Sequence, residues 1–345
     1  MGLEGILGQG WRQALRLAGG VARQTVLLGR LLPSRSSAVK ARELGNQLEV
    51  FETFHGAESI VGLRRDLPVA AHLRRLRRLP VFTALWVAEG LAYSRSPDEL
   101  DLEALQAGIP LHTGMGMRLA REALRDLERG DDRRLGRLPE EARKRSRPGY
   151  GRLTFEPLGF VARTLHPGRT SDIDRRLERS APELRAWLWH GVGRGLYFSP
   201  TGDPLVQARS AAPDEVGRRN ATAGAAWALT LVNLRHPEVV AAFLAGLDHR
   251  AETEHAVVNG ITSAALLWLD GHGLDPTLTA FLDPPAPDRA WTSWVTDPFE
   301  RARERYRRLV ACRRLEELFI CPAEGGRRWP EPRPERPATR ATSPR

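Results

Sequence analysis

The feature that most constrains the fold of this chain is a passage that occurs twice. Residues 86–94 read WVAEGLAYS, and residues 192–199 read VGRGLYFS. Each passage is followed by a stretch rich in small residues, at 112–120 and 220–229, and a weaker echo lies at 259–268. Because a repeated passage indicates a repeated structural unit, the sequence predicts an internally duplicated architecture.

The repeated stretches have the composition of helices. Small residues recur four positions apart, as at Gly116 and Ala120, which places them on one face of a helix. A glycine inside a helix costs about 1 kcal/mol relative to alanine, so its repeated use indicates close helix–helix contact or room for a ligand. Strand-like alternation with hairpin dipeptides is nearly absent. We therefore predict a mainly α-helical fold: an internally duplicated helical domain with small-residue helix packing and a flexible C-terminal tail rich in proline and arginine.

Composition divides the chain into five predicted segments. Residues 1–50 read as an N-terminal amphipathic helix and linker, 51–127 as a first helical half, and 128–150 as a charged linker. The second helical half and a C-terminal helix occupy 151–320. The tail at 321–345 reads as disordered because it is rich in proline and arginine and poor in apolar residues.

Charge and hydropathy narrow the class of protein. The formal net charge is +10, but almost all the basic residues are arginine, and residues 326–345 alone hold six arginines against two glutamates. With no zinc-finger spacing and no aromatic RNA-binding signature, we predict no specific nucleic-acid partner. The chain lacks an apolar run of about 18 residues and a signal peptide, so we expect no transmembrane segment and a cytoplasmic location. The basic amphipathic helix expected at 3–32 leaves contact with a membrane surface open.

Large aromatic side chains stand in or beside the small-residue stretches. An aromatic ring that faces a backbone without side chains either fills the core or lines an apolar cavity, the usual kind of small-molecule site. Both alternatives are open from the sequence. The candidate pocket residues are Trp86, Tyr93, Gly116, Trp189, Tyr197, Trp227, Asn259 and Trp268.

Four charged or titratable residues are embedded among small and apolar neighbours, where burial without a partner is costly. Glu89 and Arg194 occupy equivalent places in the repeated passage, so one hypothesis is that they face each other or a shared ligand. The alternative is that each lies in another ion pair or at an exposed helix end. The candidates for general acid–base catalysis or charge stabilisation are Glu89, Arg118, His190 and Arg194.

No cofactor and no metal site is predicted. The glycines at 191–195 follow helical text rather than a buried strand, which argues against a dinucleotide-binding loop. Cys312 and Cys321 are the only cysteines and lack the spacing of a metal-binding pair. The acidic residues at 131–132 and 172–174 match fragments of terpene-cyclase motifs without the complete pattern.

The order of these passages resembles a family of bacterial proteins, a domain of unknown function associated with enediyne polyketide biosynthesis. The resemblance covers roughly residues 82–282. Its third block resembles Gly-Leu-Gly-Arg-Ser-Leu-Trp-Phe and matches best, whereas residues 222–225 depart from an expected Ser-Gly-Val-Gly type segment. The family supplies no established catalytic residues to transfer. The blocks that carry the resemblance are residues 89–93, 112–120, 191–198 and 223–229.

This resemblance implies a role in secondary metabolism. Our leading interpretation is an accessory protein that binds or remodels a hydrophobic intermediate of enediyne or polyketide type, with a polyketide synthase or another pathway protein as a candidate partner. Whether the chain is an enzyme stays open. One alternative is a terpene-cyclase-like all-α enzyme, which strict dependence on Mg²⁺ and diphosphate would identify. The other is a non-catalytic scaffold for a biosynthetic synthase.

Overall fold

A computed structural model describes residues 35–60, 68–199, 203–247, 251–284 and 289–321. These residues are helical and contain no β-strand, so the prediction of a mainly α fold is confirmed. The α-helices are α2 (Arg35–His55), α3 (Ala57–Ile60), α4 (Val69–Leu76), α5 (Val81–Ser94), α6 (Ile109–Glu128), α7 (Arg133–Arg145), α8 (Gly151–Phe155), α9 (Pro157–Leu165), α10 (Thr170–Ser180), α11 (Arg185–Tyr197), α12 (Pro204–Ala211), α13 (Glu215–Val232), α14 (Pro237–Ala245), α15 (Ala251–His272), α16 (Pro276–Leu282), α17 (Arg289–Trp291) and α18 (Asp297–Ala311). Short turns of other helix types are η1 (Pro97–Glu99), η2 (Pro167–Arg169), η3 (Pro182–Leu184), η4 (Thr292–Thr296) and η5 (Leu315–Leu318).

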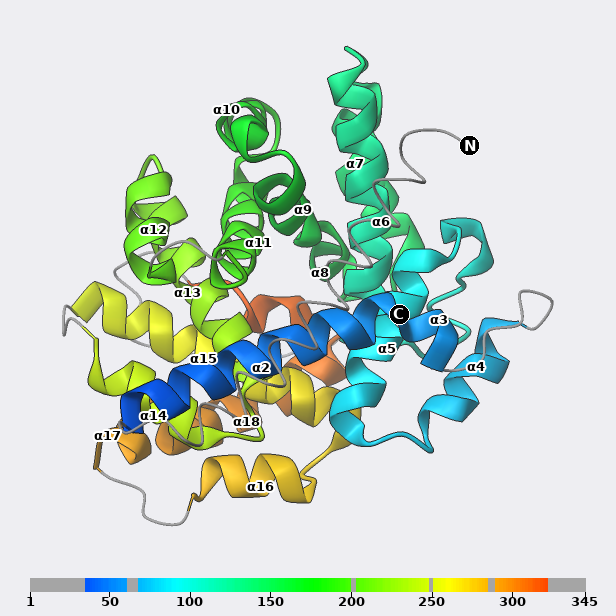
Figure 1. Cartoon of the computed structure of the whole chain (residues 1–345). Helices are drawn as coiled ribbons and strands as arrows, with labels where there is room; N and C mark the ends of the chain where they lie inside the picture. Colours follow the sequence, from blue (N-terminus) through cyan, green and yellow to red (C-terminus); the bar gives the residue numbers. More distant parts are fainter. Residues whose placement is uncertain (1–34, 61–67, 200–202, 248–250, 285–288, 322–345) are drawn as a thin grey trace, which may run out of the picture.

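The longer helices pack in a continuous series. α5 lies against both α2 and α6, α6 also contacts α9, and α9 packs against α11. α11 packs along α13 and α13 along α15, in the two most extensive helix contacts of the described residues. In Figure 1, α7, α10 and α12 project on one side of the molecule, while α2 crosses in front of α15 and α5. Buried apolar side chains from the whole series form one core that extends from Val50 to Phe319.

Glycines occupy the crossings of this series. A Cβ on Gly159 of α9 would lie 1.8 Å from the carbonyl oxygen of Leu188 in α11. A Cβ on Gly193 of α11 would lie 2.0 Å from the carbonyl oxygen of Ala221 in α13. Heavy atoms do not approach so closely, so these helix–helix distances require a residue without a side chain. The recurring small residues therefore serve close contact between main chains.

Local sequence determines where several helices begin. α12, α14 and α16 each start with proline, whose missing N–H is not needed in the first turn. Asp203, Asp214 and Asp275 directly precede α12, α13 and α16. Their carboxylates accept hydrogen bonds from backbone N–H groups of the first turn, which otherwise lack a partner.

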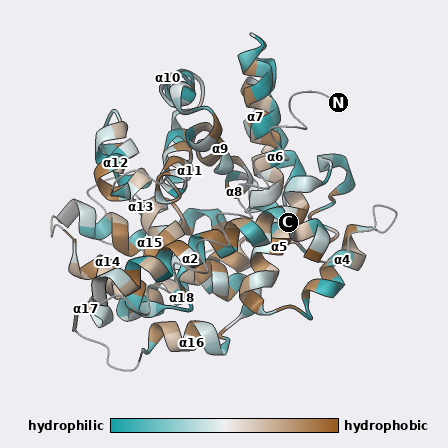
Figure 2. Ribbon diagram, viewed as in Figure 1, coloured by the Kyte–Doolittle hydropathy of each residue, from teal (hydrophilic) through white to brown (hydrophobic). Residues whose placement is uncertain are grey.

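The two repeated passages lie in helices with similar surroundings. The first forms most of α5 and the second the end of α11, and each packs against a glycine-bearing helix, α6 or α13. The internal duplication and the division into halves stay predictions. The stretch at 128–150, expected as a linker, contains α7, whose outer surface is largely hydrophilic (Figure 2). Leu135, Leu138 and Ala142 give α7 a buried apolar stripe among its charges.

Two other predicted features fall outside the described residues. They are the amphipathic helix at 3–32 and the tail after Cys321. Among the helices of the described ranges, none has the length and apolar character needed to cross a bilayer.

Candidate functional site

Four charged or titratable side chains meet inside the helical core. Arg194 donates from Nη2 to Glu89 Oε1 at 3.0 Å and from Nη1 to Glu156 Oε2 at 2.9 Å. The other oxygen of Glu156, Oε1, lies 2.9 Å from Nδ1 of His190. Each of these side chains is only 3–4% exposed, so bulk water does not reach them. We call Glu89, Glu156, His190 and Arg194 the buried charge network.

Two helices and one helix junction position the buried charge network. α5 contributes Glu89, and α11 contributes His190 and Arg194, which are four residues apart and therefore share a face. Glu156 occupies the junction between α8 and α9, immediately before Pro157 begins α9. Two segments that lie far apart in the sequence, α5 and the α8–α9 junction, thus meet at the guanidinium group of Arg194.

Glycines of neighbouring helices touch the main chain at three of the four network residues. A Cβ at each of these glycines would lie 1.9–2.2 Å from the carbonyl oxygen of a network residue. The absence of a side chain therefore lets the helices approach closely at the positions from which the charged groups project. The pairs are Gly114 with Glu89, Gly191 with Glu156, and Gly224 with His190.

Aromatic rings border the network. The guanidinium carbon of Arg194 lies 5.0 Å from the ring centroid of Phe160 and 4.9 Å from that of Trp227. These distances are within the range of cation–π attraction, which stabilises a cation away from water. Trp227 also stands edge-on to His190, with 5.9 Å between the ring centroids. The site therefore combines a charged centre with an aromatic boundary.

The surroundings move the pKa values of the two carboxyl groups in opposite directions. Burial raises the pKa of Glu89, and Arg194 and Thr113 offset this only in part. Burial acts in the same direction on Glu156, but Arg194 and His190 outweigh it and hold the pKa of Glu156 below its ordinary value. Burial alone would lower the pKa of Arg194, whereas the charges of Glu156 and Glu89 raise it overall. The two carboxyl groups of the site therefore differ in their affinity for a proton.

Several buried polar atoms at the network have no hydrogen-bond partner within the described residues. They are Nε2 of His190, Nε of Arg194 and Nε1 of Trp227. Leaving a buried polar atom unpaired costs about 1–3 kcal/mol. Because Nδ1 of His190 is held by Glu156, the unpaired Nε2 is the atom through which this imidazole can exchange a proton with another molecule.

α13 and α15 carry a second group of buried polar atoms that lack partners in the described part of the chain. They are the hydroxyl oxygens of Thr230 and Thr262 and both amide atoms of Asn259. All three residues are at most 2% exposed. Asn259 and Thr262 share a face of α15, and Thr230 lies one turn after Trp227 on α13. Since buried polar groups are normally satisfied, a bound molecule would gain hydrogen bonds here too.

Of the four candidate catalytic residues, the structure brings three together. The ion pair proposed between Glu89 and Arg194 is present, and His190 lies in the same network. Arg118 does not join them: its side chain is 36% exposed on α6 and paired with Glu122, four residues later. The expectation that Arg118 is embedded in the interior is wrong, because a same-helix carboxylate satisfies its charge at the surface.

Among the predicted pocket residues, three have unpartnered buried polar atoms within the described residues. Trp227 contacts the network directly, and Asn259 belongs to the second polar group on α15. Trp86, on α5, is 3% exposed, and its Nε1 has no hydrogen-bond partner within these residues.

The other five predicted pocket residues make specific contacts elsewhere. In four of them an aromatic side chain has its polar atom hydrogen-bonded, and in the fifth a glycine touches a neighbouring main chain. These contacts fit core packing rather than a shared pocket. They are Trp189 with Asp174, Trp268 with Asp275, Tyr197 with Asn233, Tyr93 with Arg121, and Gly116 with Thr154.

Sequence reasoning missed Glu156, Phe160 and the contribution of Thr113 to Glu89. Glu156 carried a usable signal, because it is the one charged residue in the stretch 153–162. The same criterion, a charge within an apolar and small-residue passage, selected Glu89. Phe160 has no comparable signal, since one phenylalanine in an apolar helix fits any core position.

Comparison of the chain with protein-family models, with curated proteins and with solved structures gives no match. The resemblance to the enediyne-associated family stays a prediction. The candidate site rests on its own geometry.

Proposed function

We propose that this chain binds a hydrophobic intermediate of secondary metabolism in its helical core and transfers a proton on it at His190. The observation that carries the proposal is the Glu156–His190 pair. Nδ1 of His190 is held by the Glu156 carboxylate, whereas Nε2 of His190 is buried and has no hydrogen-bond partner among the residues that the structure describes. A carboxylate that orients an imidazole and stabilises its charged form prepares the other nitrogen for general acid–base catalysis.

Each network residue has a chemical role in this proposal. His190 accepts a proton from a carbon or oxygen of the ligand through Nε2, while Glu156 stabilises the imidazolium that forms. Arg194 stabilises negative charge that develops on the ligand. Glu89 holds the guanidinium of Arg194 in place through their ion pair. The imidazolium of His190 then returns its proton at a second position of the ligand, so that the site ends in its starting state. Removal and return of one proton leaves the composition of the ligand unchanged, so the reaction class is isomerisation.

Two features support a hydrophobic ligand. The network is bordered by Phe160 and Trp227. Both the network and the second polar group on α13 and α15 hold polar atoms that a ligand with a few oxygens would satisfy. Sites for such molecules are mostly apolar with few polar groups. The enediyne or polyketide class of the ligand comes from the family resemblance alone. Because the network is closed to solvent, binding requires helices packed around it to separate.

The first test identifies the ligand. Full-length protein is isolated from its producing host, analysed by native mass spectrometry, and extracted under denaturing conditions. We expect a bound conjugated, largely apolar metabolite. Repeated preparations that carry a synthase component and no small molecule would contradict the proposal and favour the scaffold interpretation.

The second test separates proton transfer from binding. The extracted ligand is incubated with the protein in D₂O, and deuterium incorporation at carbon is measured by mass spectrometry. His190→Asn is the informative variant because its amide can still bond to Glu156 but offers no base. We expect it to retain ligand and to lose deuterium incorporation at least tenfold. Equal incorporation by His190→Asn and the unaltered protein would refute the role of His190.

The terpene-cyclase-like alternative gains no support from the acidic residues that suggested it. Cyclases of that kind need carboxylates available to divalent metal ions. Here each carboxylate has an arginine partner. The pairs are Asp131 with Arg133, Asp132 with Arg176, Asp172 with Arg175, and Asp174 with Arg185.

A further inference from the structure

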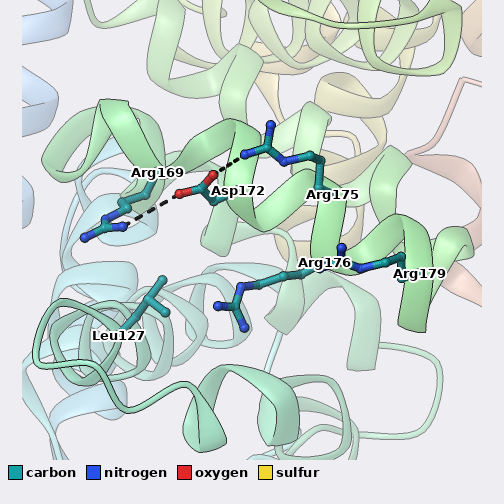
Figure 3. Close-up of a pocket in the computed structure, with 6 residues that line it drawn as sticks. All are labelled: Leu127, Arg169, Asp172, Arg175, Arg176 and Arg179. Atoms are coloured by element: carbon teal, nitrogen blue, oxygen red, sulfur yellow. Dashed lines mark hydrogen bonds and ion pairs between the residues drawn. The ribbon is translucent and has the colours of Figure 1, made fainter.

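A second site candidate lies on the surface of α10, apart from the buried charge network. A hollow of about 370 Å³ opens there, and we call it the arginine pocket (Figure 3). Figure 3 shows the side chains of Arg169 and Arg176 bordering the same hollow as Leu127, which comes from the end of α6. The lining residues are Leu127, Arg169, Asp172, Arg175, Arg176 and Arg179.

The helix α10 has two distinct faces. Its inner face carries Ile173, Asp174 and Leu177, all buried, and Asp174 binds Arg185 and Trp189 at the start of α11. The outer face carries the pocket residues at positions 172, 175, 176 and 179, which are spaced three and four apart. The inner contacts hold the helix in place, so the outer arginines project from a fixed support.

Positive charge in the arginine pocket exceeds the negative charge available to it. Asp172 is shared between Arg175, at 2.5 Å, and Arg169, at 3.7 Å. Arg176 has Asp132 as its partner. Arg179 is exposed and forms no ion pair with another described residue. Four arginines against the two aspartates Asp172 and Asp132 leave a surplus of two positive charges that a bound anion would balance.

The surplus of positive charge reduces the stability of α10. Arg175 and Arg179 are four residues apart, and Arg176 and Arg179 three apart, so like charges are neighbours on the helix surface. Such neighbours destabilise a helix by about 0.2–0.5 kcal/mol per pair. The unbalanced stripe together with the hollow indicates a function for the arginines.

We propose that the arginine pocket binds the phosphate group of a small phosphorylated molecule. Guanidinium groups present paired N–H donors that match phosphate oxygens, and several arginines around one hollow suit a group with more than one negative charge. The concave shape and limited volume favour a small molecule over the surface of a protein or nucleic acid. Leu127 supplies an apolar contact for the organic part of such a molecule. This site is independent of the proton transfer proposed above.

Isothermal titration calorimetry with inorganic pyrophosphate tests the proposal on the full-length chain at physiological ionic strength. Arg179→Gln and Arg169→Gln each remove one pocket charge. Arg307→Gln is the matched control, because Arg307 is 60% exposed on α18 and its loss changes the net charge equally. Circular dichroism checks that all three variants keep their helix content.

We expect one saturable site per chain, with affinity about tenfold weaker in each pocket variant and unchanged in Arg307→Gln. Pyrophosphate should also bind more tightly than sulfate at equal ionic strength, because sulfate lacks the additional charge. Two results would overturn the proposal. One is no saturable binding of pyrophosphate, and the other is equal weakening in the control, which would indicate general attraction to a basic surface.

Discussion

Removal of Arg194 is the sharpest test of the buried charge network. In Arg194→Met the side chain keeps similar bulk but loses both charge-assisted hydrogen bonds, to Glu89 and to Glu156. Each such bond contributes about 1.5–3 kcal/mol. Breaking a buried ion pair from one side costs about 3–5 kcal/mol, because the remaining charge stays buried without a partner. We therefore expect the free energy of unfolding to fall by about 3–5 kcal/mol at pH 8.

The loss should depend on pH with a definite sign. In the unaltered protein the pKa of Glu156 is lowered, so its contribution to stability is present above about pH 4.5 and is lost as the pH falls through the folded-state pKa. The pKa of Glu89 is raised, so its contribution is present at low pH and is lost as the pH rises. Without Arg194 both carboxyl groups lose the charge that most lowers their pKa values, so burial raises both, offset in part by Thr113 at Glu89 and by His190 at Glu156. The variant therefore takes up protons on folding. The destabilisation should therefore be smaller at pH 5 than at pH 8.

Urea unfolding followed by circular dichroism at the two pH values measures this difference. Arg307→Met is the matched control, since Arg307 is 60% exposed, and its effect should stay within about 0.5 kcal/mol. Adding Glu89→Gln and Glu156→Gln to Arg194→Met should restore most of the lost stability, because no buried charge is then left unpaired. A destabilisation below about 1 kcal/mol at pH 8, or one that grows on acidification, would refute the reasoning.

Three further predictions follow from individual contacts. Gly224→Ala should destabilise the fold by more than about 2 kcal/mol, because its Cβ would lie 1.9 Å from the carbonyl oxygen of His190. Gly136→Ala on α7, where an added Cβ would have no described atom within 4 Å apart from its neighbours and its own helix backbone, should instead stabilise by up to about 1 kcal/mol. Thermal unfolding of both variants checks the pair. Burial raises the pKa of Cys321 to about 12, so a thiol reagent at pH 8 should modify exposed Cys312 rapidly and Cys321 only after unfolding. Burial lowers the pKa of His112 to about 4, and NMR titration of its ring should show no protonation between pH 8 and 6.

Sequence reasoning succeeded for residues whose burial in the structure follows from the apolar and small residues beside them in the sequence. Glycines spaced along helices predicted close helix packing, and the structure places Gly159 and Gly193 at such crossings. The equivalent places of Glu89 and Arg194 in two apolar passages suggested that they pair, as one of two open hypotheses, and the structure contains this pair. In both cases the cost of burial restricts the alternatives sufficiently for sequence reasoning to succeed.

Sequence reasoning failed for residues whose burial depends on which helix packs against them. Arg118 has the same apolar and small neighbours as Glu89, yet Glu122 four residues later allows it to stay at the surface. The division of the chain at 128–150 stays a prediction, and this stretch holds α7, in which Leu135 and Leu138 are buried. Glu156 could have been selected by its apolar surroundings, but its partners on α11 are not visible from local sequence.

The glycine pattern and the buried charge network depend on each other. Three network residues, Glu89, Glu156 and His190, have their own carbonyl oxygens against a glycine of the next helix. At larger helix separations, the hydrogen bonds of 2.9–3.0 Å between these side chains would require different rotamers or intervening water. A larger residue at any of these glycines would therefore separate the charged groups as well as the helices. This coupling explains why small residues and isolated charges occur in the same passages of the sequence. The helices must approach closely for the charged side chains to pair, and pairing lowers the free-energy cost of burying these charges in an otherwise apolar core.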